Sequence, residues 1–132
     1  RIWVCYNIVK KLIMKIMIVE DHEGMRQLLK SMILSHFKDS IVIIECENGE
    51  RAIEKFPKNK PDLVLMDIEM GELDGFQTTE IIHSTYPEAK IIFVSSNDST
   101  EFRKKAKKLN ALDFVSKETL SDIYEVVEKN LA

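Results

Sequence analysis

From Lys15 onward the sequence alternates short apolar runs with amphipathic stretches, and this alternation restricts the folds open to the chain. The apolar runs predict five strands, at 16–20, 41–46, 63–66, 90–95 and 113–116. Strands that alternate with amphipathic helices are typical of βαβ units, whose strands lie parallel in one sheet. We therefore expect an α/β fold.

Apolar residues recur at helical spacing after each predicted strand. The first helix carries Met25, Leu28 and Ile33 on its apolar side and Arg26 on the opposite side. The other helices are expected around 52–56, 76–83, 102–109 and 120–127. Pro57 should help to end the second helix because proline lacks a backbone hydrogen-bond donor.

The composition indicates one ordered domain. The 132 residues are 45% hydrophobic and 31% charged, which suits a single core. A net charge of -3 gives no electrostatic signal for nucleic-acid binding. The basic cluster from Arg103 to Lys108 is interpreted as a solvated helix face.

Cys5 and Cys46 show neither a disulfide framework nor metal-ligand spacing, which favours a reducing compartment. No apolar run reaches the ~18 residues that span a bilayer, so we expect a cytoplasmic protein with no membrane partner. The pattern becomes regular only at Met14, and residues 1–13 are interpreted as an N-terminal extension of uncertain origin.

Polar residues stand at the carboxyl ends of four predicted strands. The apolar run from Leu63 to Met66, for example, gives way directly to Asp67. Right-handed crossovers bring these strand ends to one edge of the sheet, where ligands bind. The residues expected to meet there are Glu20, Asp21, Asp67, Ser95 and Lys117.

These residue types suit phosphoryl transfer assisted by a divalent cation. Neighbouring carboxylates repel one another unless a cation lies between them, and such oxygen ligands suit Mg²⁺. Asp67 can then attack a phosphoryl group while Lys117 neutralises its oxygens and Ser95 donates a hydrogen bond. A single aspartate at a strand end is more often a turn former, so the prediction depends on the joint arrangement.

Four segments, VEDHEGMR, LVLMDIEMGELDG, IIFVSS and DFVSK, resemble the receiver domain of two-component response regulators. The resemblance covers nearly the whole chain and implies that residues 14–132 form a receiver domain. It also implies a flavodoxin-like (βα)5 fold, a doubly wound parallel sheet with strand order 2-1-3-4-5.

The resemblance implies roles for individual residues. Asp67 corresponds to the phosphoacceptor, Asp21 to a direct Mg²⁺ ligand and Glu20 to an acid that acts through water. The backbone carbonyl of Glu69 falls where a third protein ligand is expected. Lys117 corresponds to the lysine that binds the phosphoryl group.

A conformational switch is also implied by the resemblance. Ser95 corresponds to the switch hydroxyl and Phe114 to the switch aromatic residue, and Ser95 and Ser96 are expected to contact the phosphoryl group. Phosphorylation would pull Ser95 inward and let the ring of Phe114 fill the vacated space. The face formed by helix 102–109 and strand 113–116 would then change for a partner.

The implied phosphodonor is a phosphohistidine on a histidine kinase or a histidine phosphotransfer protein. A downstream protein would bind the changed face, and a homodimer is a further candidate. The run KETL at 117–120 is similar to receivers with a helix-turn-helix output domain, which does not follow here. Nucleic acid would be bound only through such an absent domain, and the chain is either a stand-alone receiver or a fragment.

Two other functions compete with this interpretation. A Mg²⁺-dependent phosphohydrolase could use Asp67 and Glu69, but no second aspartate follows two residues after Asp67. A phosphorylation-independent binding module is disfavoured because all five site groups are present. We expect no turnover enzyme, but a protein that catalyses its own phosphorylation and dephosphorylation.

Overall fold

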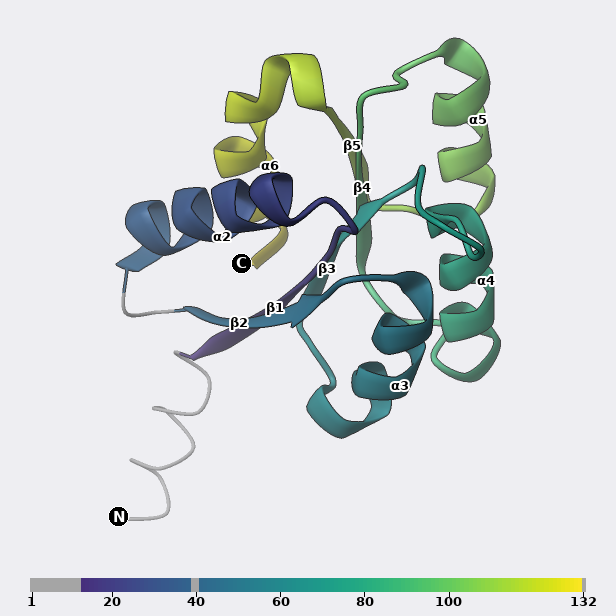
Figure 1. Ribbon diagram of the computed structural model, residues 1–132, viewed down its shortest axis with the longest axis horizontal. Coiled ribbons are helices and arrows are strands. Elements are labelled where there is room, and N and C mark those ends of the chain that lie inside the picture. Colours follow the sequence, from purple (N-terminus) through teal and green to yellow (C-terminus); the bar gives the residue numbers. More distant parts are fainter. Residues whose placement is uncertain (1–12, 39–40, 132) are drawn as a thin grey trace.

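The computed structural model describes residues 13–38 and 41–131, which form a five-stranded parallel sheet between two layers of helices (Figure 1). The strand order is β2-β1-β3-β4-β5, so the predicted doubly wound, flavodoxin-like α/β fold is confirmed. The strands are β1 (Met14–Val19), β2 (Ile41–Cys46), β3 (Leu63–Asp67), β4 (Ile91–Ser95) and β5 (Asp113–Ser116).

Helices follow every strand and cover both faces of the sheet. One face carries α2 and α6, and the other carries α3, α4 and α5 (Figure 1). Their bounds are α2 (Glu23–Phe37), α3 (Gly49–Asn59), α4 (Gly75–Thr85), α5 (Thr100–Lys108) and α6 (Ile123–Leu131), with a 3-10 segment, η2 (Lys117–Asp122), before α6. No helix among these described residues is long and apolar enough to cross a membrane.

Alternate side chains of the central strands enter the two halves of the core. In β3, Val64 and Met66 pack towards α3, α4 and α5, whereas Leu63 and Leu65 pack towards α2 and α6. All five residues of β3 are buried, as expected for a strand covered on both faces. This packing fixes the register of the strand that presents Asp67 at its carboxyl end.

The structure corrects three predictions about the helices. Pro57 lies inside α3, which ends instead at Lys60, a residue with a left-handed φ of 42° whose N–H donates to the Phe56 carbonyl. The spacing predicts Leu28 on the apolar side of α2, yet it is 47% exposed. It predicts Arg26 on the side opposite the apolar residues, but only 12% of the Arg26 side chain is exposed because it turns inward over β2.

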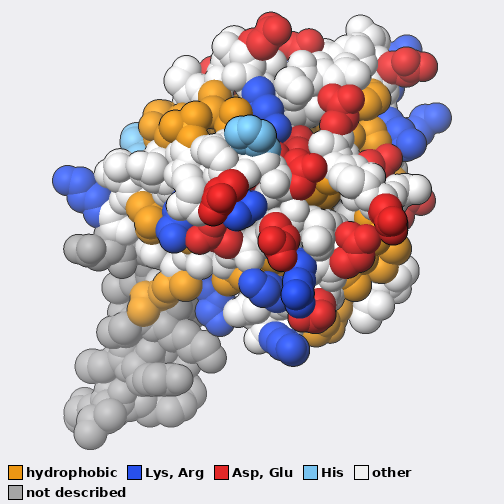
Figure 2. Space-filling view, in the orientation of Figure 1, with side chains coloured by type: hydrophobic (Ala, Val, Ile, Leu, Met, Phe, Trp, Pro, Cys, Tyr) orange, Lys and Arg blue, Asp and Glu red, His pale blue; other side chains and the backbone are white. Residues whose placement is uncertain are grey.

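The predicted extension, residues 1–13, lies outside the described residues except for Ile13. Cys5 belongs to that segment, whereas Cys46 is a buried free thiol at the end of β2. Acidic, basic and apolar side chains are interspersed over the face of the molecule that Figure 2 shows. This face carries no continuous basic surface, in agreement with the acidic net charge.

Candidate functional site

Three acidic side chains meet at the carboxyl edge of the sheet. Glu20, Asp21 and Asp67 each offer one carboxylate oxygen, and these oxygens lie within 4.8 Å of one another. Asp67 ends β3 and is 5% exposed, Glu20 follows β1 and is 1% exposed, and Asp21 is exposed to solvent. The predicted meeting of these residues is therefore present in the structure.

Lys117 links two of these carboxylates. Its Nζ donates to Glu20 Oε1 at 2.6 Å and to Asp67 Oδ1 at 3.2 Å. The side chain of Lys117 is 15% exposed, so its charge lies largely within the protein. Lys117 follows β5 and Asp67 ends β3, so the order of the strands brings them together.

The loop after β1 is held by further hydrogen bonds. The backbone N–H of Glu20 donates to the Cys46 carbonyl at 3.0 Å, and Glu20 Oε2 accepts from the N–H of His22 at 3.1 Å. His22 is the N-cap of α2, and its Nδ1 accepts from the N–H of Met25 at 3.1 Å. The His22 imidazole therefore caps the N-terminus of α2, and the backbone N–H of the same residue orients the Glu20 carboxylate.

Burial and mutual repulsion set the charges of the site. Burial and the neighbouring Glu20 carboxylate raise the pKa of Asp67 to about 7, against the opposing effect of Lys117. Burial also disfavours ionised Glu20, but hydrogen bonds, foremost from Lys117, hold its pKa below the ordinary value. Burial would lower the pKa of Lys117, yet the Glu20 and Asp67 carboxylates raise it. Without a cation, one buried carboxylate is paired with Lys117 and Asp67 is poised to bind a proton.

The donor set suits a hard divalent cation. The three acids line an open depression of about 520 Å³, in which Glu69, Ser96 and Lys117 also take part. Two buried carboxylates and one exposed carboxylate provide oxygen ligands and leave room for water, as Mg²⁺ requires. A cation there would relieve the repulsion that raises the pKa of Asp67.

The two serines at the end of β4 differ in exposure. Ser95 is fully buried, and its Oγ accepts from the N–H of Asn97 at 3.1 Å. Ser96 is exposed and lines the depression beside Asp67. Ser96 is thus the serine with access to a group bound in the depression, whereas Ser95 is not among the residues that line it.

Phe114, the predicted switch residue, lies half-buried on β5. The guanidinium carbon of Arg103 lies 4.7 Å from the centre of its ring, a cation–π contact. Nε of Arg103 also donates to the carbonyl of Asp98 at 3.3 Å, in the loop after β4. Arg103 therefore connects the aromatic ring to the loop that begins at Ser96, directly after Ser95 at the end of β4.

Arg26 is the residue at this edge that the sequence prediction missed. Its Nη1 donates to the Glu20 carbonyl at 2.9 Å. The helical spacing predicts Arg26 on the side opposite the apolar residues of α2, and that spacing does not indicate that its side chain reaches back over the preceding loop. A signal was available only in the acidic Glu45 on β2, which pairs with it at 3.2 Å.

A family model described as the response regulator receiver domain matches residues 16–128. The chain belongs to this family. The match includes Asp67, Lys117 and the loop after β1 that contains Glu20 and Asp21, hereafter the acidic loop. It confirms the family indicated by the sequence segments.

Individual receiver proteins are similar over most of this receiver domain. Chemotaxis protein CheY of Listeria monocytogenes is 35% identical over 117 residues, which cover 88% of this chain and 97% of that protein. Transcriptional regulatory protein DegU of Brevibacillus brevis is 32% identical over 108 residues, which cover 82% of this chain and 45% of DegU. This domain is thus similar both to a protein of nearly its own length and to part of a longer regulator.

Solved structures agree with the fold. Response regulator TrrA of Thermotoga maritima, in complex with Mg²⁺-BeF, superposes with a TM-score of 0.77 and is 29% identical. The superposition covers 91% of this chain and 100% of that chain. The receiver fold described above is therefore shared with a protein whose own structure contains Mg²⁺.

Proposed function

We propose that this receiver domain accepts a phosphoryl group on Asp67 in a two-component phosphorelay. The observation that carries the proposal is the bridge of Lys117 Nζ to both Glu20 and Asp67 at 2.6 and 3.2 Å. The Lys117 ammonium lies beside the buried Asp67 carboxylate at an open depression, where it can neutralise the negative charge of phosphoryl oxygens. Burying these charged groups has a desolvation cost that their pairing often does not recover, so a contribution to stability alone does not explain the arrangement.

The transfer itself is a displacement at phosphorus. An Asp67 carboxylate oxygen forms the new bond to phosphorus, and the bond to the phosphohistidine nitrogen of the donor breaks. Lys117 then shifts its contact from the carboxylate to a phosphoryl oxygen, and Ser96 donates from the edge of the depression. Ser95, which is buried beside this edge, would join them by turning its hydroxyl towards the phosphoryl group.

Mg²⁺ is the cofactor proposed for this site. Asp21 and Asp67 would hold it directly, Glu20 would act through water, and the carbonyl of Glu69 would provide a third protein ligand. When bound, Mg²⁺ supplies positive charge that offsets the charge on the phosphoryl oxygens. The three clustered carboxylates support this assignment.

The downstream effect is proposed to be a change at the surface formed by α5 and β5. Movement of Ser95 would release the space into which the ring of Phe114 turns, away from the Arg103 guanidinium. A downstream protein that binds one arrangement of the ring better than the other would shift the equilibrium towards it. The phosphodonor is proposed to be a histidine kinase or a histidine phosphotransfer protein.

Intact-mass spectrometry tests the proposal. The wild-type protein is incubated with a small acyl phosphate, with Mg²⁺ or with EDTA. We expect the mass of one phosphoryl group to be added only with Mg²⁺ and to be absent from Asp67→Asn. Asp98→Asn is the matched control, because Asp98 is exposed in the loop after β4, and it should be labelled like the wild type.

Two outcomes would contradict the proposal. Equal labelling of the wild type and Asp67→Asn would place the phosphoryl group elsewhere. Steady release of phosphate from ordinary phosphomonoesters would favour the competing phosphohydrolase.

A further inference from the structure

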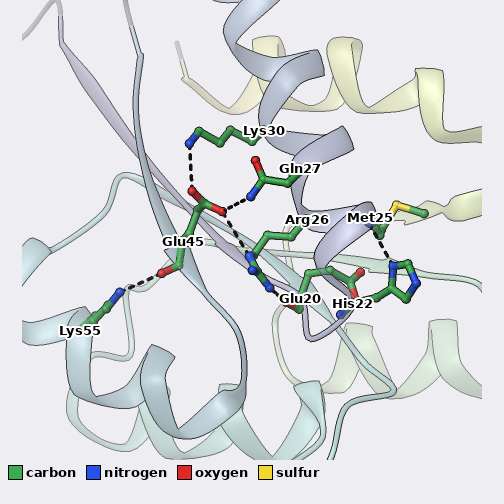
Figure 3. A network of polar contacts seen from close by, with 8 residues as sticks. All are labelled: Glu20, His22, Met25, Arg26, Gln27, Lys30, Glu45 and Lys55. Carbon is green, nitrogen blue, oxygen red and sulfur yellow. Dashed lines mark hydrogen bonds and ion pairs between the residues drawn. The ribbon is translucent and has the colours of Figure 1, made fainter.

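A polar network beneath the acidic loop connects β2 to Glu20 through Arg26, in the first turn of α2. Nη1 of Arg26 donates to the Glu20 carbonyl at 2.9 Å, and Nε donates to Glu45 Oε1 at 3.2 Å (Figure 3). One guanidinium thus joins the backbone of the acidic loop to a carboxylate on the edge strand. The planar fork of arginine can make both contacts at once, whereas a lysine ammonium is a point charge.

Glu45 is itself firmly held. Its Oε1 also accepts from Gln27 Nε2 at 2.8 Å, and its Oε2 accepts from Lys30 Nζ at 2.9 Å (Figure 3). The hydrogen bond from Lys30, with help from Arg26, keeps the pKa of Glu45 below its ordinary value. Lys55 Nζ donates to the Glu45 carbonyl at 2.9 Å. The carboxylate that anchors Arg26 is therefore charged and fixed in direction.

The contact from Arg26 completes the support of the residue before Asp21. The N–H of Glu20 donates to Cys46 on β2, and the Glu20 carbonyl accepts from Arg26. This carbonyl belongs to the peptide unit that leads into Asp21. Within the described part of the chain, the Asp21 carboxylate itself accepts no hydrogen bond, so the backbone of this loop is what sets the position of its Cα and Cβ.

We propose that Arg26, anchored by Glu45, is a positioning residue that orients the Glu20–Asp21 peptide unit so that the site binds a divalent cation tightly. The inference rests on the proposed function, because it takes Asp21 and Asp67 as cation ligands. Arg26 touches neither the cation nor the phosphoryl group in this scheme. Its effect passes through the backbone, as outer hydrogen bonds orient ligands at other metal sites.

Charge alone predicts the opposite effect for Arg26. Removing a positive charge near a cation site strengthens cation binding by long-range electrostatics. Loss of orientation weakens binding instead. The sign of the change in Mg²⁺ affinity therefore separates a positioning role from a general charge effect.

Arg51 supplies the matched control. It lines the same surface depression as Arg26 and Glu45, but it pairs with Glu47 at 3.8 Å and Glu54 at 3.2 Å. Arg51→Gln removes the same charge from the same region, and Arg51 has no contact with Glu20 among the residues described.

The experiment is calorimetric titration of Mg²⁺ into the full chain. We expect Arg26→Gln and Glu45→Gln to weaken Mg²⁺ binding about tenfold, the lower end of the range for such outer contacts. Arg51→Gln should bind as tightly as the wild type or slightly more tightly. Arg26→Lys should restore part of the affinity, because it keeps the charge but makes only one of the two contacts.

Folding is checked for each variant by circular dichroism, and the titration is made on folded protein. Should Arg26→Gln fail to fold, Glu45→Gln decides the question, because its amide keeps the shape of the glutamate and loses the charge that anchors the guanidinium. Removing a negative charge also weakens cation binding by itself, so Glu45→Gln is compared with Glu47→Gln, which removes the same charge from the same depression, where Glu47 pairs with Arg51 instead. Unchanged Mg²⁺ affinity in the deciding variant, or a loss equalled by its charge-matched control (Arg51→Gln for Arg26→Gln, Glu47→Gln for Glu45→Gln), would overturn the positioning role alone. Wild-type protein that does not bind Mg²⁺ would overturn both this inference and the proposed cofactor.

Discussion

Lys117 Nζ lies 2.6 Å from Glu20 Oε1, although 97 residues separate the two along the chain. The same nitrogen lies 3.2 Å from Asp67 Oδ1. In the protein without a cation, Lys117 is therefore the counter-charge for Glu20, and also for Asp67 when the pH exceeds the raised pKa of Asp67, about 7. Because its pKa is raised, Lys117 keeps this charge across the neutral range.

Lys117→Met should lower the stability of the Mg²⁺-free protein. Removing one partner of a buried ion pair leaves an uncompensated charge, at a cost of about 3–5 kcal/mol, and proton uptake by Asp67 at neutral pH will offset part of that cost. We therefore expect a loss of about 2–4 kcal/mol in the free energy of unfolding. Urea unfolding in EDTA at pH 8 measures this loss, and added Mg²⁺ should restore more stability to the variant than to the wild type.

Lys129→Met is the control for this variant. Lys129 pairs with Asp113 at 3.2 Å, but its side chain is 62% exposed. Exposed pairs contribute about 0–1 kcal/mol, so little change is expected. Equal losses in the two lysine variants would show that Lys117 is not the counter-charge of buried carboxylates.

Asp67→Asn should make the Mg²⁺-free protein more stable, increasingly so as the pH rises. The folded-state pKa of Asp67 is raised from 3.8 to about 7. Below pH 3.8 the Asp67 carboxyl is protonated in both the folded and the unfolded protein, and it does not affect the free energy of unfolding. As the pH rises from 3.8 to about 7, the unfolded protein loses this proton first, and the folded protein loses stability. The gain of the variant over the wild type should thus be small near pH 4 and level off above pH 7 at about 2–4 kcal/mol.

Urea unfolding in EDTA, repeated between pH 4 and pH 9, measures this difference. Subtracting the free energy of unfolding of the wild type from that of Asp67→Asn at the same pH removes the contribution of the titratable groups that the two proteins share. A difference that stays constant over this range would contradict the raised pKa of Asp67. With saturating Mg²⁺ the order should reverse, because only the wild type keeps the full set of carboxylate ligands.

The sheet and its edge were predictable because both depend on patterns local to each strand. Asp67 directly follows an apolar run, Lys117 directly follows the predicted strand 113–116, and parallel connectivity brings such strand ends together. Helix ends were harder to predict. Pro57 is accommodated within α3, and the helix ends where Lys60 adopts a left-handed conformation. A lysine at this position does not predict that conformation, which glycine or asparagine would indicate.

Arg26 shows a second limit of sequence reasoning. Helical periodicity places it on a polar face, but its partners, the Glu20 carbonyl and Glu45, come from a preceding loop and from the edge strand. Such a contact depends on how α2 lies against β2. The buried state of Ser95 and its hydrogen bond to Asn97 likewise follow from the turn after β4 rather than from the residue type.

Cys46 should resist thiol reagents while the protein is folded. Burial raises the pKa of its thiol to about 11, against the opposing charges of Lys55 and Arg26. The reactive thiolate is then scarce at pH 8 and is also shielded from reagent. Peptide mapping after brief iodoacetamide treatment should show Cys46 unmodified in native protein and modified in urea. Rapid native labelling at Cys46 would contradict its burial.

Gly75→Ala should destabilise the protein and weaken its Mg²⁺ binding together. A Cβ added at Gly75 would overlap the carbonyl oxygen of Asp67 and would lie 2.8 Å from Cα of Ile68, so backbone next to the proposed phosphoacceptor has to move. We expect a loss of about 2–4 kcal/mol in the free energy of unfolding, measured in urea, and weaker Mg²⁺ binding by calorimetry.

Gly71→Ala is the matched control, because nothing lies within 4 Å of its added Cβ. That variant should be unchanged or more stable by about 0.4–1 kcal/mol, since alanine restricts the unfolded chain. If both alanine variants behaved alike, the close approach of Gly75 to Asp67 would not be what requires a glycine there.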